Sequence, residues 1–395
     1  MINFVRWSYH IAYQANILTQ ILKEINRHEF KKQVSKYSGD HKTHKLSCFN
    51  LLTVMMYTHL KANITLRRIV TGLGLMLSSF YHLNLKSIKR STLSDALKQR
   101  DSQIYEEYYY SLLKNLNREQ RRKFGNKINI IDSSTISLCV EKFNWVKYKS
   151  TKGGIKLHTM IDGDTRIPEQ VIITDAKVHD INGVKKKIKH RQSEIYVYDR
   201  GYACYEYLYD IELQGAFFIT RLKSNWKTKV LTSKVCEGTS GLFDEVIEVD
   251  GPKHAEYPTL LQVVTFYHEE SDKILKFLTN NFKLTAECIA EIYKYRWQIE
   301  LFFKWIKQHL KITSFLSTSK NGVKTQIWCA LITYLLLNII KNRLIKSVDL
   351  FEIYRRLALA VDKRIGIYEL IANKIESTIT TENVCDSGQM ELHFA

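Results

Sequence analysis

The residues best suited to chemistry form one spaced group, Y-x2-R-x3-E-x6-K, at Tyr293, Arg296, Glu300 and Lys307. An α-helix turns about 100° per residue, so on a helix these side chains would fall within roughly 60° of one another. That helical face would carry a carboxylate flanked by two cations and a phenol. Such a group suits metal-dependent phosphoryl transfer on a nucleic acid, because the carboxylate can hold a metal ion and the cations can hold phosphates. The alternative is a solvated helix whose charges only pair with one another.

The same segment carries an apolar strip beside the charged one. This strip predicts that the helix buries one face against a core while the charged face points into a site. Its members are Ile292, Ile299, Phe302, Phe303, Ile306 and Leu310.

Two aspartates upstream could complete the chemistry. Asp132 ends the short apolar segment 127–132, and Asp199 ends the similar segment 194–199. Two carboxylates at the ends of neighbouring strands, together with Glu300, could gather oxygen ligands for two Mg²⁺ ions. Two such ions about 3.5–4 Å apart would activate the attacking oxygen and stabilise the leaving one. Each aspartate taken alone is more often a turn or helix cap.

The elements around these residues follow a β-rich pattern. Strands are expected at 127–132, 154–161, 169–174, 194–199 and 216–221, with a helix at 203–214, in the order βββαβαβ before the helix that bears Glu300. Four more strands, at 227–235, 242–249, 259–267 and 273–279, indicate a β-rich insertion over 222–283.

The first 115 residues predict helices instead. The helices are expected at 15–36, 47–60, 65–74, 91–99 and 103–116. Thr65 is followed by Arg67 and Arg68, and Ser91 is preceded by Arg90, so two helix starts would combine Ser/Thr caps with cations. Helix N-termini beside cations bind phosphates well, which favours a helical DNA-binding domain. A helical bundle that contacts no nucleic acid remains the alternative.

Composition points to a polyanionic partner. The 395 residues carry a formal net charge of +19, and residues 1–120 hold 18 Lys/Arg against 8 Asp/Glu. No lipidation signal or basic membrane anchor stands out, so double-stranded DNA is expected as the partner and a membrane is not. Seven scattered cysteines without a CxxC pair, and an N-terminus unlike a signal peptide, predict a cytoplasmic, nucleoid-associated protein. The apolar run 327–340 is expected to be a buried helix.

Other residues with metal-like or catalytic spacing have ordinary interpretations. His41, His44 and Cys48 lack an obvious fourth ligand for zinc. His158 could support the site or could equally be a hydrogen-bonded core histidine. The remaining carboxylates near the strand connections are expected to be turn and cap residues. They are Asp162, Asp164, Asp175 and Asp180.

These motifs together resemble one family. IIDSSTI around Asp132, YDRGY around Asp199, and the Tyr293/Arg296/Glu300/Lys307 signature are similar to bacterial DDE transposases of insertion-sequence family four, the group defined by Y-R-E-K. KGGIKLH at 152–158 and the segment 315–337 resemble the same core. INRHEFKKQVSKY and KRSTLSDA resemble an uncharacterised domain that precedes this core in many members.

The resemblance implies a mixed α/β fold with an RNase H-like catalytic core. The expected parts are an all-α domain at 1–115, the core at 116–221 and 284–345, the β-rich insertion at 222–283, and a C-terminal helical region and tail at 346–395. It also implies Mg²⁺-dependent cutting at terminal inverted repeats, with two ions and with Mn²⁺ able to substitute. The freed 3′-OH would then attack target DNA, and a homodimer on DNA is implied.

Residue roles follow from the same resemblance. Asp132, Asp199 and Glu300 would hold the metal ions and catalyse. Residues that would bind DNA, by gripping phosphates or a displaced nucleotide, are Tyr293, Arg296, Lys307 and Arg200. Trp226 could stack on an unpaired base, although packing within the insertion is the more ordinary role for it. Two other functions stay open: a catalytically silent DNA-binding protein derived from a transposase, and an RNase H-like nuclease without strand transfer.

Overall fold

The structure, a computed structural model, describes residues 15–62, 65–76, 85–114, 116, 125–146, 153–185, 187–235, 243–268, 272–344 and 348–371. The chain forms two compact units. One combines residues 1–115 with 309–395, and the other comprises residues 116–308. The chain therefore leaves the first unit, builds the second, and returns.

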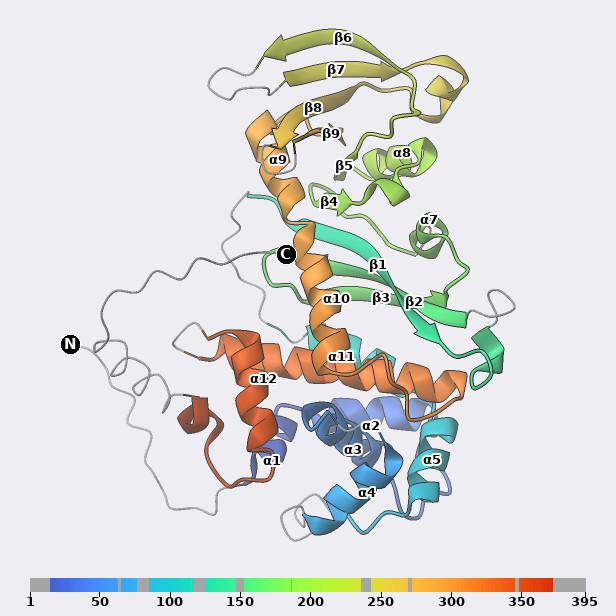
Figure 1. The fold of residues 1–395 in the computed structure, drawn as a ribbon, viewed down its shortest axis with the longest axis vertical. Helices are drawn as coiled ribbons and strands as arrows, with labels where there is room; N and C mark the ends of the chain where they lie inside the picture. The colour runs from blue at the N-terminus through green and yellow to red at the C-terminus, as the bar shows by residue number, and fades with distance from the viewer. Residues whose placement is uncertain are drawn as a thin grey trace, which may run out of the picture. The chain divides into compact units, whose positions relative to one another are not determined.

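The second unit is built on one nine-stranded sheet (Figure 1). Its strand order is β3-β2-β1-β4-β5-β9-β8-β7-β6. The strands are β1 (Ile128–Leu138), β2 (Gly153–Asp162), β3 (Pro168–Asp175), β4 (Ile195–Tyr198), β5 (Phe217–Arg221), β6 (Thr228–Val235), β7 (Phe243–Val249), β8 (Leu261–His268) and β9 (Lys273–Thr279). β1, β4 and β5 are parallel, and the other pairings are antiparallel.

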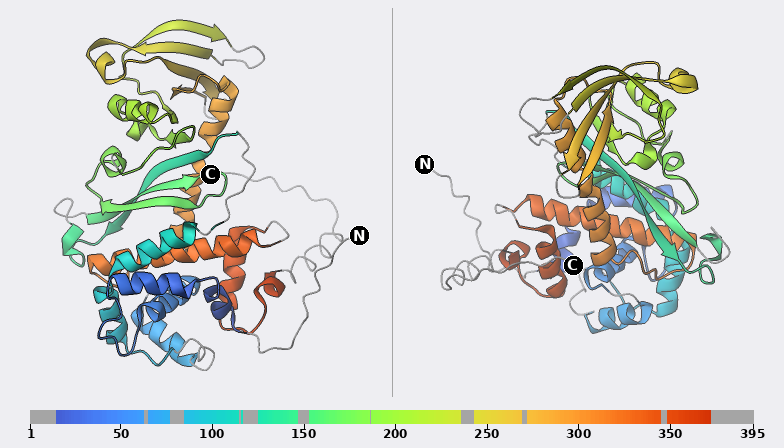
Figure 2. Two further views of the ribbon diagram at one scale, coloured as in Figure 1. Left: turned by 180° about the vertical axis from the view of Figure 1, so that it is seen from behind. Right: turned by 45° about the horizontal axis from the view of Figure 1, so that its top comes forward.

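Helices cover both faces of this sheet. α7 (Asp180–Val184) and α8 (Tyr205–Leu213) lie on one side of β4 and β5, while α9 (Ala286–Lys294) and α10 (Trp297–His309) lie on the other (Figures 1 and 2). The parallel strands in the middle are buried on both faces, which is why β4 reads as an unbroken apolar run, IYVY. The strand order β3-β2-β1-β4-β5, with β1, β4 and β5 parallel and helices on both faces, confirms the expected mixed α/β fold with an RNase H-like core.

Strand alternation decides which side chains meet which helices. On the α7/α8 side, Ile131, Tyr198 and Phe218 pack with Leu208 and Ile211 of α8 in one buried cluster. Successive side chains of a strand point to opposite faces, so Asp132 faces the α10 side and Ser133 faces the α7 side. This alternation matters for the site described below.

The first unit is helical and is built around one long buried helix. Its helices are α1 (Ile17–Leu22), α2 (Arg27–Lys36), α3 (Cys48–Leu60), α4 (Leu66–Leu75), α5 (Arg90–Gln99), α6 (Ser102–Lys114), α11 (Lys320–Asn342) and α12 (Leu350–Leu359). α11 packs against α3, α5, α6 and α12. Trp328 of α11 lies against Tyr109 and Tyr110 of α6, with ring centroids 5.6 and 5.7 Å apart.

The apolar run 327–340 belongs to this buried helix. α11 is long and apolar enough to cross a membrane by length and composition, but 94% of its most apolar window is buried inside the protein. Its polar groups are satisfied locally, because Thr333 and Asn338 donate hydrogen bonds to the carbonyls of Cys329 and Tyr334, four residues earlier. The expectation of a buried helix agrees with the packing of α11.

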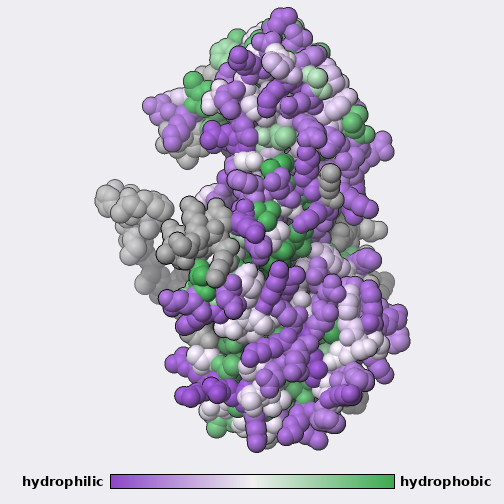
Figure 3. Space-filling model, turned by 90° about the vertical axis from the view of Figure 1, so that its right-hand side faces the viewer, coloured by the Kyte–Doolittle hydropathy of each residue, from purple (hydrophilic) through white to green (hydrophobic). Residues whose placement is uncertain are grey.

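Hydrophilic side chains cover most of the face shown in Figure 3, with apolar ones in small groups.

Several boundaries differ from those expected. The single helix expected at 15–36 is two helices, because the Asn26 side chain accepts hydrogen bonds from His28 N and Glu29 N and starts α2 there. Thr65 caps α4 as expected, but Lys89 precedes α5 without a side-chain cap. The segment 284–345, expected to continue the core, is divided between the units at 308/309. The expected tail from 372 onwards lies outside the described residues.

Candidate active site

Parallel pairing brings Asp132 and Asp199 together. β1 and β4 pair up to Ile131 opposite Tyr198, and each aspartate is the next residue of its strand or strand end. The two carboxylates therefore stand side by side at the carboxyl ends of adjacent parallel strands. β1 does not end at Asp132 as predicted but continues to Leu138, because its antiparallel partner β2 extends to Gly153.

The signature segment is not one continuous helix. α9 ends at Lys294, Tyr295 and Arg296 form a turn, and α10 begins at Trp297. Arg296 N donates to Tyr293 O at 3.0 Å and Ile299 N to Arg296 O at 3.3 Å, so the connection is a tightened turn with hydrogen bonds three residues back. Tyr293 thus lies on α9, Arg296 in the turn, and Glu300 on α10. The apolar strip from Ile292 to Leu310 is buried as predicted.

Arg296 connects two of the three acidic residues. Its guanidinium lies 2.5 Å from Glu300 Oε1 and 3.5 Å from Asp132 Oδ2. No group of three metal-binding side chains is already gathered around one point among the described residues. The Arg296 guanidinium lies between Asp132 and Glu300. A set of carboxylate oxygens at this place would also attract a hard divalent cation.

The protonation of Asp132 reflects this crowding. Burial, helped by the charges of Asp199 and Glu300, raises its pKa to about 6. The Ser133 backbone N–H, 2.7 Å from Oδ1, and the Arg296 charge oppose that rise. A bound cation would favour the ionised form of this buried Asp132 carboxylate.

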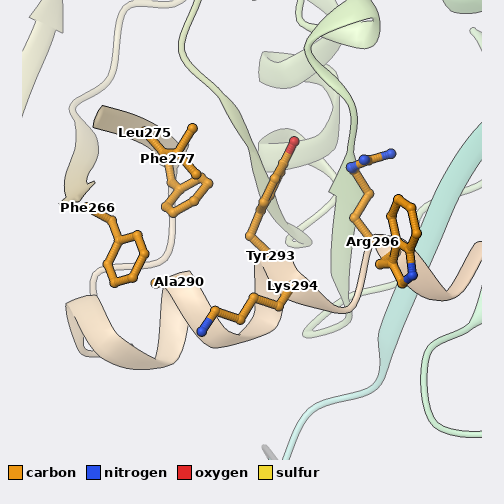
Figure 4. Close-up of a pocket in the computed structure, with 8 residues that line it drawn as sticks. Phe266, Leu275, Phe277, Ala290, Tyr293, Lys294 and Arg296 are labelled. Atoms are coloured by element: carbon orange, nitrogen blue, oxygen red, sulfur yellow. The ribbon is translucent and has the colours of Figure 1, made fainter. Parts of the chain in front are cut away.

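An aromatic cavity adjoins the turn that carries Arg296. It has a volume of about 160 Å³, and it is lined by Phe266, Leu275, Phe277, Ala290, Tyr293, Lys294, Arg296 and Trp297. Tyr293 stands between Phe277 and Arg296, with its hydroxyl on the same side as the guanidinium (Figure 4). The Phe277 and Tyr293 ring centroids are 4.6 Å apart, and burial raises the pKa of Tyr293 to about 12. The phenol is therefore neutral at physiological pH.

Residues 123–336 match the family model of the transposase DDE domain. This match covers more than half of the chain. The chain belongs to the DDE transposases. Residues 14–86 match a second model, the domain of unknown function DUF4372. The resemblance seen in the sequence, including an uncharacterised N-terminal domain, is confirmed.

Known relatives agree with the assignment. A Sinorhizobium fredii protein named as transposase y4zB is 36% identical over 252 residues. The match covers 62% of this chain and 70% of the relative. A Geobacillus stearothermophilus protein named for insertion sequence element IS5377 is 28% identical over 62% of this chain and 66% of its own length. A Synechocystis protein named as a transposase of insertion sequence element IS4SA is 29% identical over 67% of this chain and 76% of its own length.

One solved structure is similar in outline. The piggyBac transposase synaptic complex with hairpin DNA aligns with a TM-score of 0.47 at 10% identity, over 94% of this chain and 85% of that one. The family assignment does not depend on this alignment.

The other expected DNA-binding residues of the transposase lie around the acidic group at different places. Lys307 of α10 donates a 3.0 Å hydrogen bond to the carbonyl of Thr135, three residues along β1 from Asp132. Burial lowers the pKa of Lys307. Arg200 is exposed and directly follows Asp199, in the 3₁₀ turn Arg200–Tyr202. Both cations therefore border the strands that carry the aspartates.

Trp226 occupies a separate place in the transposase. Its ring stacks on Tyr205 of α8 at 3.8 Å between centroids and 29° between planes. The two aromatic residues line a cavity of about 300 Å³ together with Asn225, Lys227, Asp250, Pro252 and Lys253. Packing on Tyr205 thus accounts for one face of the Trp226 ring.

Asp180 was expected to be a turn or cap residue, and this expectation is wrong. Its carboxylate accepts a 2.5 Å hydrogen bond from Ser133 Oγ and lies 2.9 Å from Lys156 Nζ. Burial raises its pKa, but these hydrogen bonds outweigh burial and hold the pKa below its ordinary value. The signal was invisible in the sequence because Ser133, Lys156 and Asp180 come from three separate elements.

Asp162 and His158 have structural contacts of their own. Asp162 accepts hydrogen bonds from Asp164 N and Thr165 N and so forms a turn. His158 is buried, its Nε2 lies 2.9 Å from Thr174 Oγ1, and burial lowers its pKa to about 4.

Proposed function

We propose that this transposase cleaves DNA at the terminal inverted repeats of its own element and joins the freed ends to target DNA, using Asp132, Asp199 and Glu300. The observation that carries the proposal is the position of Arg296 between Asp132 of β1 and Glu300 of α10, with Asp199 placed next to Asp132 by the parallel β1–β4 pairing. Each residue comes from a different element. Asp199 also caps the turn Arg200–Tyr202, because its Oδ2 accepts a 3.3 Å hydrogen bond from Gly201 N.

The donor set fits a hard divalent cation. Asp132, Asp199 and Glu300 would hold Mg²⁺ as a pair of ions, with Mn²⁺ able to substitute. When bound, the ions supply activation of the attacking oxygen and stabilisation of the leaving oxygen. The raised pKa of Asp132, about 6, supports this role because bound cation would favour the ionised carboxylate.

The chain's own cations would position the DNA. Arg296 can exchange its ion pairs for contacts with a phosphate, because a guanidinium forms paired hydrogen bonds with carboxylates and phosphates alike. Lys307 and Arg200 flank Asp132 and Asp199 and would hold phosphates on either side of the cut. Their placement supports a DNA path across the carboxyl ends of β1 and β4.

The aromatic cavity beside Arg296 would accept a displaced base. Phe266, Phe277, Tyr293 and Trp297 offer ring faces, and base–aromatic stacking contributes about 1–3 kcal/mol per base. Trp226, with Lys227 and Lys253 beside it, would hold a more distant unpaired nucleotide. We therefore propose that the aromatic cavity and Trp226 both contact DNA strands near the cut.

The helical unit would bind the repeat itself. Arg67 and Arg68 at the start of α4, and Lys89 and Arg90 at the start of α5, are exposed, and α4 packs against α5. Exposed cations at two neighbouring helix starts suit phosphate binding. We further propose a homodimer on DNA, since two ends must be cut, and a cytoplasmic location with the nucleoid.

The proposal is tested with DNA that flanks the gene of this transposase. Labelled fragments carrying the terminal repeats should be cut in Mg²⁺ or Mn²⁺ and not in EDTA. Precut ends should then be joined to a target plasmid. Binding without any metal-dependent cutting would show instead a silent DNA-binding protein, and cutting without joining would show a nuclease that lacks strand transfer.

A further inference from the structure

We propose that Asp180, held by Lys156 and joined to Ser133, is a positioning residue that fixes the orientation of the Asp132 carboxylate from the opposite face of the sheet. This inference rests on the proposed function of Asp132. It concerns a residue outside the three carboxylates and outside the Y-R-E-K signature. Ser133 is the physical link between the two.

The link begins at Asp132 itself. Ser133 N donates a 2.7 Å hydrogen bond to Asp132 Oδ1, while Ser133 Oγ donates a 2.5 Å hydrogen bond to Asp180 Oδ1. Adjacent strand residues point to opposite faces, so one residue joins the α10 side of the sheet to the α7 side. The Ser133 Oγ–Asp180 hydrogen bond therefore restrains the residue whose N–H orients Asp132.

Asp180 is itself firmly held. Lys156 Nζ lies 2.9 Å from Asp180 Oδ1 and donates another 2.9 Å hydrogen bond to the carbonyl of Val178. The Lys156 side chain is only 13% exposed, so this ion pair is shielded from water on one side. Asp180 is the first residue of α7, yet its side chain leaves the helix to contact β1 and β2.

The helix that carries Asp180 is fixed by close packing. A Cβ atom on Gly183 of α7 would lie 2.2 Å from His158 Cε1, so only glycine permits this approach of α7 to β2. His158 is opposite Ser133 in the β1–β2 register, and both point to the α7 side. The close packing and the Ser133 hydrogen bond therefore act on the same patch of sheet.

Asp180 also lies beside the second catalytic aspartate. Asp199 Oδ2 and Asp180 Oδ2 lie 3.7 and 4.0 Å from the point that a Cβ on Gly201 would occupy. The turn Arg200–Tyr202 packs against α7. A carboxylate in this position can orient Asp132 through Ser133 without being counted among the metal ligands, as residues behind metal ligands commonly do.

The test uses the full-length transposase with Mn²⁺ as the probe. The variants are Asp180→Asn, which breaks the ion pair, Ser133→Ala, which removes the link but leaves Lys156 and Asp180 paired, and Ser133→Thr, which restores a hydroxyl. Mn²⁺ affinity is measured by calorimetry, and cleavage of the gene-flanking DNA is measured across Mn²⁺ concentrations. Glu206→Gln removes the surface ion pair with Lys185 and serves as the matched control.

We expect Asp180→Asn and Ser133→Ala to weaken Mn²⁺ binding and raise the Mn²⁺ concentration for half-maximal cleavage about 10–100-fold. Ser133→Thr should return both values toward wild type, and Glu206→Gln should match wild type. A purely structural role would lower the melting temperature but leave Mn²⁺ affinity unchanged, which would overturn the proposal. Loss of affinity in Asp180→Asn but not in Ser133→Ala would also overturn it.

Asp132→Ala separates this inference from the proposed function. If Asp132→Ala still cleaves like wild type, the assignment of the site fails and the inference fails with it. If Asp132→Ala is inactive while Asp180→Asn and Ser133→Ala have wild-type Mn²⁺ dependence, only the inference is wrong.

Discussion

At the scale of single residues, Arg296 is the most informative side chain. It lies between Asp132 and Glu300 and neutralises charge that would otherwise be repulsive. The guanidinium neutralises these carboxylates when no metal is bound. It would therefore compete with a divalent cation for the same two carboxylates. Arg296 is thus expected to stabilise the metal-free protein and to move toward DNA phosphate when the site is loaded.

Replacing Arg296 tests this competition. Arg296→Ala should raise Mn²⁺ affinity in the absence of DNA about tenfold, equivalent to about 1.4 kcal/mol, because the competing guanidinium is gone. Cleavage should nevertheless fall, because the phosphate contact is lost. Calorimetry with Mn²⁺ and a cleavage assay give the two values, and weaker Mn²⁺ binding in the variant would contradict the competition.

The raised pKa of Asp132 predicts a pH-dependent stability. An acid whose pKa rises from 3.8 when unfolded to about 6 when folded holds its proton more tightly in the folded state. The associated stability is present below about pH 4 and is lost as pH rises through about 6. Asp132→Asn should therefore stabilise the metal-free protein by about 1–3 kcal/mol at pH 8.

Chemical denaturation at pH 8 and pH 4 measures that effect. Near pH 4 Asp132 is largely protonated in the folded protein, so the variant and wild type should differ little. A variant that is equally or less stable at pH 8 would show that the buried carboxylate is not under electrostatic strain.

At the scale of elements, the site depends on where strands and helices stop. The aspartates meet because the parallel β1–β4 pairing reaches Ile131 and Tyr198, and the signature residues separate because α9 and α10 meet at Arg296. The close contact of α7 with β2 at Gly183 is a third such constraint. Each can be changed without touching a carboxylate.

Gly183→Ala tests the third constraint. The added Cβ would collide with the His158 ring at 2.2 Å, so α7 must shift away from the sheet. We expect a loss of about 1–3 kcal/mol in the free energy of unfolding, typical of overpacking, together with reduced cleavage. Thermal denaturation and cleavage assays read both, and Gly74→Ala, where a Cβ meets nothing within 4 Å, is the matched control.

Tyr293 allows packing and chemistry to be separated. Tyr293→Ala should destabilise the protein by about 3–5 kcal/mol, because it removes a ring packed on Phe277. Tyr293→Phe keeps the ring and should leave unfolding nearly unchanged. If Tyr293→Phe cleaves as slowly as Tyr293→Ala, the hydroxyl itself contacts DNA. If it cleaves like wild type, the ring is the part that matters.

Local patterns predicted the elements that bear the site but not their joins. Asp199 after an apolar strand and the buried strip from Ile292 to Leu310 could be read from spacing alone. The turn at Tyr295–Arg296 could not, because neither glycine nor proline marks it. The extension of β1 past Asp132 depends on pairing with β2, and the contact of Asp180 with Ser133 spans 47 residues of chain.

At the scale of the whole molecule, the net positive charge determines which class of partner the protein binds. The formal net charge of +19 favours polyanionic DNA over neutral or basic partners and predicts strong salt dependence. If about six phosphates are contacted, affinity should fall about 10³-fold between 50 and 200 mM salt. Fluorescence anisotropy with gene-flanking DNA measures this slope. A salt-independent affinity would contradict an electrostatic interface.

Catalysis by three carboxylates from β1, β4 and α10 is the central claim. Its most direct test is cleavage of gene-flanking DNA in Mn²⁺ by Asp132→Ala, Asp199→Ala and Glu300→Ala, with Asp210→Ala, an exposed carboxylate on α8, as control. The account predicts that all three variants bind DNA like wild type and cut at least about 10²-fold more slowly, while the control cuts normally. Cleavage at the wild-type rate by any one of the three would contradict it.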